Sequence, residues 1–271
     1  MALTALNFAA FSVTPNASGS PPAVAMLAYL KAFTFEPQNK QVDAGGLADR
    51  YPVMLNVKQA QPLDFTVFMP NTGTPPVEPV LTNLDISLWS IGGTAYVGSV
   101  RSGSIDVTTI TKEASGIASA YQSPSATRTN VQVKTQKLVV GNVAFLGNLL
   151  TGAVTSFDVT AAITFGGVAF TMPMTIKSAR HSVDREEMQL EDVVLTPKGA
   201  ATGPSDNSLL GNILLGTAQV SLVADTGGGV YSTSEGAWAL ITKLNTRFQD
   251  GACIEQSGQF VFQGPAGYAS G

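Results

Sequence analysis

The sequence has very few residues of the kinds that build most catalytic and metal sites. Its 271 residues include one cysteine and one histidine. The single thiol, Cys253, excludes an internal disulfide and any cysteine-rich zinc site. Because His181 is the only imidazole, sites that need a pair of histidines are excluded as well.

Charge is scarce too. Charged residues make up 13% of the chain, about half the usual share. The net charge of −4 and the lack of a basic stripe argue against tight nucleic-acid binding. No apolar run reaches the length of a membrane span, so we expect no membrane insertion. The amino end lacks the charged and apolar regions of a signal peptide, so we expect synthesis in a cytoplasm. Few charges favour a surface that copies of the chain or partners cover.

What the sequence does have is typical of β structure. Twenty-seven glycines and fifteen prolines, with many Thr, Ser, Val and Ala, favour short strands and tight turns. About a dozen segments have strand character, and residues 128–140 are the clearest case. There Val131, Val133, Thr135 and Lys137 alternate and share one face.

Two segments depart from the strand pattern. Residues 21–33 begin with prolines followed by Ala, Met and Leu, which predicts a short helix. Residues 235–248 place large apolar side chains, including Trp238 and Phe248, at helical spacing, which predicts an amphipathic helix. Residues 36–52 and 70–79 predict long exposed loops.

These elements predict a mainly β fold, a β-sandwich or barrel with one flanking α-helix near 236–248. Residues 1–80 form an amino-terminal region with strands, a short helix and long loops. Residues 81–271 form the sandwich. Two related sheet domains remain an open alternative.

Three Gly-Gly phrases test for a nucleotide site: IGGTAY (91–96), FGGVAF (165–170) and TGGGVY (226–231). None has the glycine spacing of a dinucleotide fold or the Lys-Ser/Thr of a P-loop, and a strand candidate follows each. Gly-Gly between two alternating runs predicts a β-hairpin whose turn needs positive φ. A second similarity links 146–153 with 210–218. The two sets have different spacings, so convergence is favoured over duplication.

The candidate chemical groups are few. His181, Asp184 and Glu187 stand at three-residue intervals and could form a carboxylate–histidine site. They lie in the densest charge run, for which a solvated loop or an inter-subunit ion-pair patch is the favoured interpretation.

Three weaker candidates complete the search for chemistry. Cys253 is expected to be a structural thiol. Glu36 and Asp43 form a possible carboxylate pair of the glycosidase kind, supported only by their presence. Trp238 and Phe248 could stack bases but fit a core better. We therefore predict no enzyme and no catalytic, cofactor-binding or metal site.

The carboxyl-terminal part carries a family resemblance. Residues 216–267 run strand, hairpin, amphipathic segment and final strand, with Gly258, Phe260 and Phe262 in a G-x-F-x-F phrase. In the order of its elements and in its residue pattern, this segment resembles the major tail (tail tube) proteins of tailed bacteriophages. Residues 155–183 look like the preceding sheet of that family, and the two pieces cover about half the chain.

The resemblance implies a structural virion protein that assembles with itself into stacked rings. Six-fold rings of one-domain subunits, or three-fold rings of duplicated subunits, would form the tail tube that delivers the genome. The implied partners are other copies, the tape-measure protein and other tail proteins, while DNA passes without specific binding. The alternatives are a non-polymerising ring of the distal tail, baseplate or head–tail connector, and a β-sandwich adhesin or carbohydrate-binding module.

Overall fold

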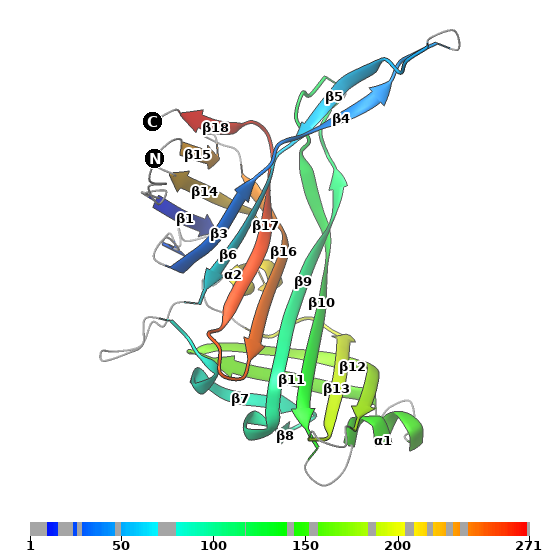
Figure 1. The fold of residues 1–271 in the computed structure, drawn as a ribbon, viewed down its shortest axis with the longest axis vertical. Coiled ribbons are helices and arrows are strands. Elements are labelled where there is room, and N and C mark those ends of the chain that lie inside the picture. The colour runs from blue at the N-terminus through cyan, green and yellow to red at the C-terminus, as the bar shows by residue number, and fades with distance from the viewer. Residues whose placement is uncertain are drawn as a thin grey trace.

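The computed structural model describes residues 10–15, 24–25, 29–46, 50–69, 80–116, 118–139, 144–151, 157–183, 188–203, 209–215, 219–225, 230–233 and 238–269. The chain is mainly β, as predicted (Figure 1). The first strands are β1 (Ala10–Pro15), β2 (Val24–Ala25), β3 (Leu30–Phe35), β4 (Gln38–Asp43), β5 (Met54–Ala60), β6 (Pro62–Phe68), β7 (Ile86–Ile91), β8 (Thr94–Ala95) and β9 (Val100–Glu113). The others are β10 (Pro124–Leu138), β11 (Asp158–Phe165), β12 (Val168–Ser182), β13 (Leu190–Pro197), β14 (Gln219–Asp225), β15 (Val230–Thr233), β16 (Ala239–Gln249), β17 (Glu255–Phe262) and β18 (Ala266–Ala269). The described helices are α1 (Ala144–Thr151) and α2 (Leu209–Leu215), with short 3₁₀ turns η2 (Asn83–Asp85) and η3 (Val97–Ser99).

Eight strands form one continuous antiparallel sheet that runs through the whole molecule. Their order is β3-β6-β17-β16-β9-β10-β13-β12, and every neighbouring pair is antiparallel. Strands from the first 80 residues therefore belong to the same sheet as the carboxyl-terminal strands. We call these eight strands the long sheet.

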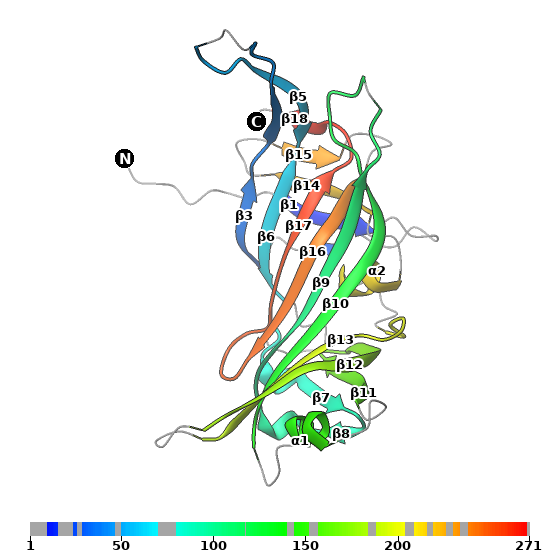
Figure 2. The ribbon, with the colours of Figure 1, turned by 90° about the vertical axis from the view of Figure 1, so that its right-hand side faces the viewer.

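A second layer covers one face of the long sheet in two separate places. In Figures 1 and 2, β1, β14 and β15 lie towards one end of the molecule, while β7, β8 and β11 lie at the other. β1 pairs with β14, and β7 pairs with β11. The apolar residues of both layers form the buried core, in which Trp89, Phe165 and Phe248 meet edge-on. The fold is thus two adjacent sandwiches that share one long sheet.

The two halves of the long sheet repeat each other pair by pair. Adding 70 to each residue number of the β3–β6 ladder gives the β9–β10 ladder, so that Leu30↔Val67 corresponds to Val100↔Lys137. The same offset carries the β4–β5 ladder onto the outer part of β9–β10, bulges included. The sequence shows almost no sign of this repeat, because the side chains at corresponding positions differ.

A second repeat links the other two hairpins of the long sheet. Adding 65 to each number of the β12–β13 ladder gives the β16–β17 ladder, so Ile176↔Leu195 corresponds to Ile241↔Phe260. Each ladder has a β-bulge directly after this pair, between Ile176 and Ser178 in β12 and between Ile241 and Lys243 in β16. Half A of the long sheet is therefore β9-β10-β13-β12, and half B is β3-β6-β17-β16. This correspondence favours an internal repeat over the convergence that the sequence suggested.

Two of the three Gly-Gly hairpins are confirmed directly. Gly92 and Gly93 have φ of 63° and 82°, and Gly166 and Gly167 have φ of 52° and 84°. Positive φ at both residues is what a two-residue hairpin turn requires and what glycine supplies without strain. The third glycine turn lies outside the described residues, although the strands on either side of it, β14 and β15, do pair.

Both predicted helices are wrong wherever the structure describes them. Residues 239–249 form β16, because Leu244, Thr246 and Phe248 alternate with polar residues and are buried on one face. Trp238 is half-buried ahead of that strand. Within 21–33, the described residues lie in or beside β2 and β3. In this segment the apolar residues fit a spacing of every second position as well as one of every third or fourth, so periodicity alone does not decide between strand and helix.

The predicted loop at 36–52 is also wrong in part. Residues 38–43 form β4, which pairs with β5 as a two-stranded ribbon. We call residues 38–46 and 50–60 the arm; in Figure 1 it projects from one end of the molecule. The predicted loop at 70–79 lies outside the described residues.

Candidate assembly surfaces

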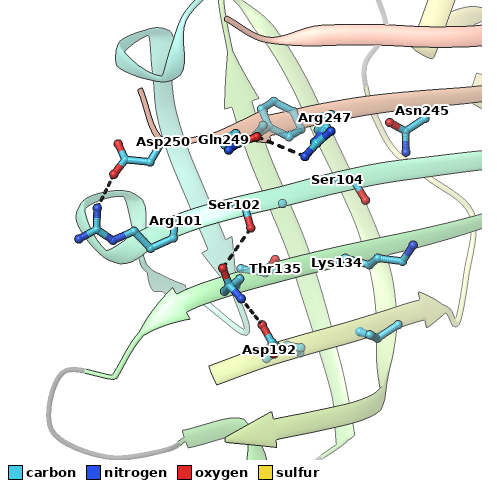
Figure 3. A pocket seen from close by; sticks show the side chains of 15 residues that line it. Arg101, Ser102, Ser104, Lys134, Thr135, Asp192, Asn245, Arg247, Gln249 and Asp250 are labelled. Carbon is cyan, nitrogen blue, oxygen red and sulfur yellow. Dashed lines mark hydrogen bonds and ion pairs between the residues drawn. The ribbon is translucent and has the colours of Figure 1, made fainter. Parts of the chain in front are cut away.

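The face of the long sheet that points away from the core is polar. Cross-strand rows run over it, such as Ser102 opposite Gln136 and Asn245 opposite Asp106. Figure 3 shows part of this surface, where side chains from β9, β10, β13 and β16 line a shallow depression of about 770 Å³. We call this surface the polar face.

Opposite charges balance on the polar face. Its paired rows contain residues of both signs: Asp64, Asp106, Asp192, Glu255, Lys134, Arg180, Lys243 and Arg247. Lys31 also pairs with Glu255, and the ion-paired Arg101 and Asp250 line the depression. Lys134 Nζ lies 2.8 Å from an Asp106 carboxylate oxygen, and Gln136 donates to Asp192 at 2.9 Å. Asn245 donates to the other Asp106 oxygen. A neutral face rich in amides and hydroxyls has no net attraction for phosphate.

The long sheet ends in two edges that no described strand covers. β3 pairs only with β6, and β12 beyond Thr175 pairs only with β13. The exposed side chains of Lys177, Ser178 and Arg180 fit an open edge. Unpaired strand edges of this kind are templates for pairing with another chain.

The two edges run in opposite directions. The strand direction alternates from each strand of the long sheet to the next. Because the number of strands is even, the first strand, β3, and the last, β12, run in opposite directions. If copies are related by rotation about an axis along the strands, β12 of one copy meets β3 of the next in antiparallel orientation. The geometry therefore permits a closed, all-antiparallel barrel.

The arm is the most apolar exposed part of the described chain. Six of the thirteen exposed large hydrophobic residues of the described chain lie on the arm: Val42, Tyr51, Val53, Met54, Leu55 and Val57. Tyr51 is 71% exposed and Leu55 is 55% exposed. Clustered apolar side chains on a projecting ribbon mark an interaction surface.

Two carboxylates hold equivalent turns at the ends of the repeated hairpins. Asp43 Oδ1 accepts hydrogen bonds from Gly45 N (2.8 Å) and Val53 N (3.2 Å). Glu113 Oε1 accepts from Ser115 N (3.0 Å) and Ser123 N (2.9 Å). Burial acts to raise the pKa of the Glu113 carboxyl, but these bonds and the Ser115 hydroxyl outweigh it, and the pKa is lowered.

The end of the molecule opposite the arm also exposes apolar side chains. Leu84 is 85% exposed, Leu150 75%, and Val183 and Met188 62% each. A cavity of about 370 Å³ beside η2 and η3 is lined in part by Leu84, Val97 and Val100. Apolar surface at both ends of a long molecule suits head-to-tail contacts between copies.

One ion pair is fully buried in half A. Lys137 Nζ lies 2.9 Å from Glu191 Oε2, and the two side chains are 4% and 0% exposed. Glu191 Oε1 also accepts from Phe145 N (3.0 Å) and Leu146 N (2.8 Å) at the start of α1. The sequence correctly placed Lys137 on the same face of its strand as Val131, Val133 and Thr135. It gave no sign of its partner Glu191, which lies in the run interpreted as solvated.

The predicted chemical candidates do not come together. His181 lies on β12 and contacts Gln189 Oε1 at 3.3 Å, while Asp184 and Glu187 are outside the described residues. Cys253 is a half-buried free thiol near Thr82. Within the described part of the chain, no group of three or more His, Cys, Asp or Glu could hold a metal ion.

The remaining candidates have structural surroundings. Asp43 holds the turn of the arm, whereas Glu36 lies at the end of β3, so the two carboxylates do not share a cavity. Phe248 is buried against Trp89 and Phe165, which leaves no surface on which a base could stack.

No protein-family model matches this sequence, and no curated protein matches it either. Among the described helices, none has the length and apolar character to cross a membrane.

Proposed function

We propose that the chain is a structural subunit of a tube: copies join through the two edges of the long sheet into closed rings, and the rings stack. The observation that carries this proposal is the pair of uncovered edges, β3 and β12, which run in opposite directions at the two ends of an even-stranded sheet. Closure covers both edges at once, which removes the hazard of open-ended aggregation.

The two-half plan supports three copies in each ring. The tail-tube resemblance allows six one-domain subunits or three duplicated ones, and this long sheet already contains two equivalent four-stranded halves. Three copies would close 24 strands. With strands 4.8 Å apart and tilted by about 40°, the barrel backbone is roughly 48 Å across, which leaves a channel of roughly 38 Å. Two copies would leave roughly 20 Å, close to the width of a DNA duplex.

The polar face would line this channel, since the core layers cover the other face. Its balanced charges and many hydroxyls suit a wall along which DNA slides without being held. The arm would provide the contact between successive rings. In this proposal the protein is a virion component, and its work is done by shape and assembly without a cofactor.

Electron microscopy of the purified protein at high concentration, with light scattering, tests the proposal. We expect rings or hollow filaments with three-fold rotational symmetry. Rings that never stack would favour the connector or distal-tail alternative. A protein that stays monomeric across the concentration range, with and without preformed tube seeds, would refute it and favour a binding module.

A further inference from the structure

The junction between the two halves of the long sheet shows how two copies of the chain could join. Half B joins half A within the molecule through β16 and β9, which pair from Lys243↔Thr108 to Gln249↔Ser102. In a closed ring, half A of one copy must join half B of the next through β12 and β3. Because a barrel closes with one strand stagger throughout, both junctions need similar geometry.

The two repeats convert the internal register into an external one. β12 corresponds to β16 through the offset of 65, and β3 corresponds to β9 through the offset of 70. In the β16–β9 ladder we subtract 65 from each residue number of β16 and 70 from each residue number of β9. The result predicts residue pairs between β12 of one copy and β3 of the next, among them Arg180↔Glu36, His181↔Phe35 and Val183↔Phe33.

The first predicted pair joins opposite charges. Asn245 and Asp106, from which it derives, are hydrogen-bonded across the internal junction. Arg180 and Glu36 are both exposed. Arg180 is in the same cross-strand row as Asp192, which places it on the polar face. An Arg–Glu pair there would extend the internal side-chain ladder with a charge-assisted contact.

Backbone geometry supports the same pair. Glu36 donates its N–H to Pro62 O, towards β6, so the backbone groups of Phe35 and Pro37 point towards the open edge. Glu36 is then a non-hydrogen-bonded position at the new junction, where opposing side chains come closest. Pro37 has no N–H to donate, so the ladder ends at this residue.

The predicted register would also cover an exposed apolar side chain, that of Val183. Val183 is 62% exposed in the single chain. Its predicted partner Phe33 packs edge-on against Phe11 of β1, in the layer that covers half B. The internal equivalent of Val183 is Phe248, which is buried. Pairing would therefore bring an exposed apolar residue next to an aromatic one.

We propose that neighbouring copies join by antiparallel pairing of β12 with β3 in the register that sets Arg180 opposite Glu36. This inference rests on the proposed ring and adds the register and the residues that fix it. The partner is a second copy of this chain. The interface is heterologous, because each copy contributes β12 on one side and β3 on the other.

Disulfide trapping tests the register. In a Cys253→Ser background, Glu36→Cys with Arg180→Cys places two thiols at a position where Cα atoms are about 4.5 Å apart, within disulfide range. The matched control, Glu36→Cys with Ser178→Cys, moves one thiol two residues along the same edge, to roughly 7–8 Å. Assembled protein is oxidised and separated on a non-reducing gel.

We expect a ladder that ends at the covalent trimer for the 36–180 pair and little cross-linking for the 36–178 pair. Equal or better cross-linking of the control, or none of either in well-formed tubes, would overturn the register and leave the tube proposal standing. If neither the parent nor any variant forms rings, the proposed function fails and the register fails with it.

A charge exchange provides an independent measurement. Because Glu36 and Arg180 are exposed, Glu36→Arg and Arg180→Glu should each leave circular dichroism and thermal unfolding unchanged. Each single variant should lose most ring formation, and the double variant should recover it. A double variant no better than the singles would overturn the pair.

Discussion

Replacing Glu191 by Gln tests the buried ion pair of half A. The amide oxygen of Gln can still accept from Phe145 N and Leu146 N, so the main loss is the negative charge 2.9 Å from Lys137. Lys137 would keep the nearby rings of Tyr96 and Phe145, whose centroids lie 5.0 Å and 5.6 Å from its Nζ. Leaving one buried charge without its partner costs about 3–5 kcal/mol.

Half B shows how the same position is filled without charge. The residues equivalent to Lys137 and Glu191 are Val67 and Gln256, which face each other across β6 and β17. Both are buried, and Gln256 donates to Thr246 Oγ1 at 3.1 Å. The double variant Lys137→Val with Glu191→Gln copies this pair, so it should recover most of the lost stability.

Urea and thermal unfolding, followed by tryptophan fluorescence, provide the measurement. For a chain of this size, a loss of about 3 kcal/mol lowers Tm by roughly 6–12 °C. The single Glu191→Gln variant should show that decrease, and the double variant should show less than half of it. A single variant within about 1 kcal/mol of the parent, or a double variant as unstable as the single, would refute the reasoning.

Gly103→Ala should cost about 1–3 kcal/mol in chemical unfolding, because its Cβ would lie 2.3 Å from the Trp89 ring, whereas Gly98→Ala, with nothing within 4 Å, should be neutral; equal effects would contradict the packing. Leu55→Ser should leave unfolding within about 0.5 kcal/mol of the parent and prevent rings from stacking in electron micrographs, and tubes of normal length would exclude that part of the arm as a contact. The Glu113 pKa is lowered in the fold, so its contribution to stability is present above the unfolded pKa and is lost as pH falls through the folded pKa. The protection of the Ser115 and Ser123 amides from hydrogen exchange, relative to the intrinsic rate at each pH, should therefore fall on acidification, and unchanged protection would contradict the role of the carboxylate.

The strand content and the glycine turns could be predicted from the sequence because both are local. Alternation placed Val131, Val133, Thr135 and Lys137 on one face, and in the structure all four are buried. Local patterns failed at residues 239–249, where apolar spacing is compatible with either period and pairing with β9 and β17 decides the outcome.

The candidate surfaces were less accessible from the sequence. The two free edges depend on which strands lie last in the sheet, and that order follows from pairings between residues far apart in the chain. The repeat that relates β3–β6 to β9–β10 preserves register and length but not residue type, so it leaves almost no trace in the sequence. Glu191 was placed in a solvated run because its partner Lys137 is 54 positions away.

The most direct test of the central claim is the structure of the assembled protein by cryo-electron microscopy. We expect three copies in a ring, a continuous antiparallel sheet from β12 of each copy into β3 of the next, and the polar face lining the channel. An assembly in which β3 and β12 stay unpaired, or in which the polar face points outward, would contradict it.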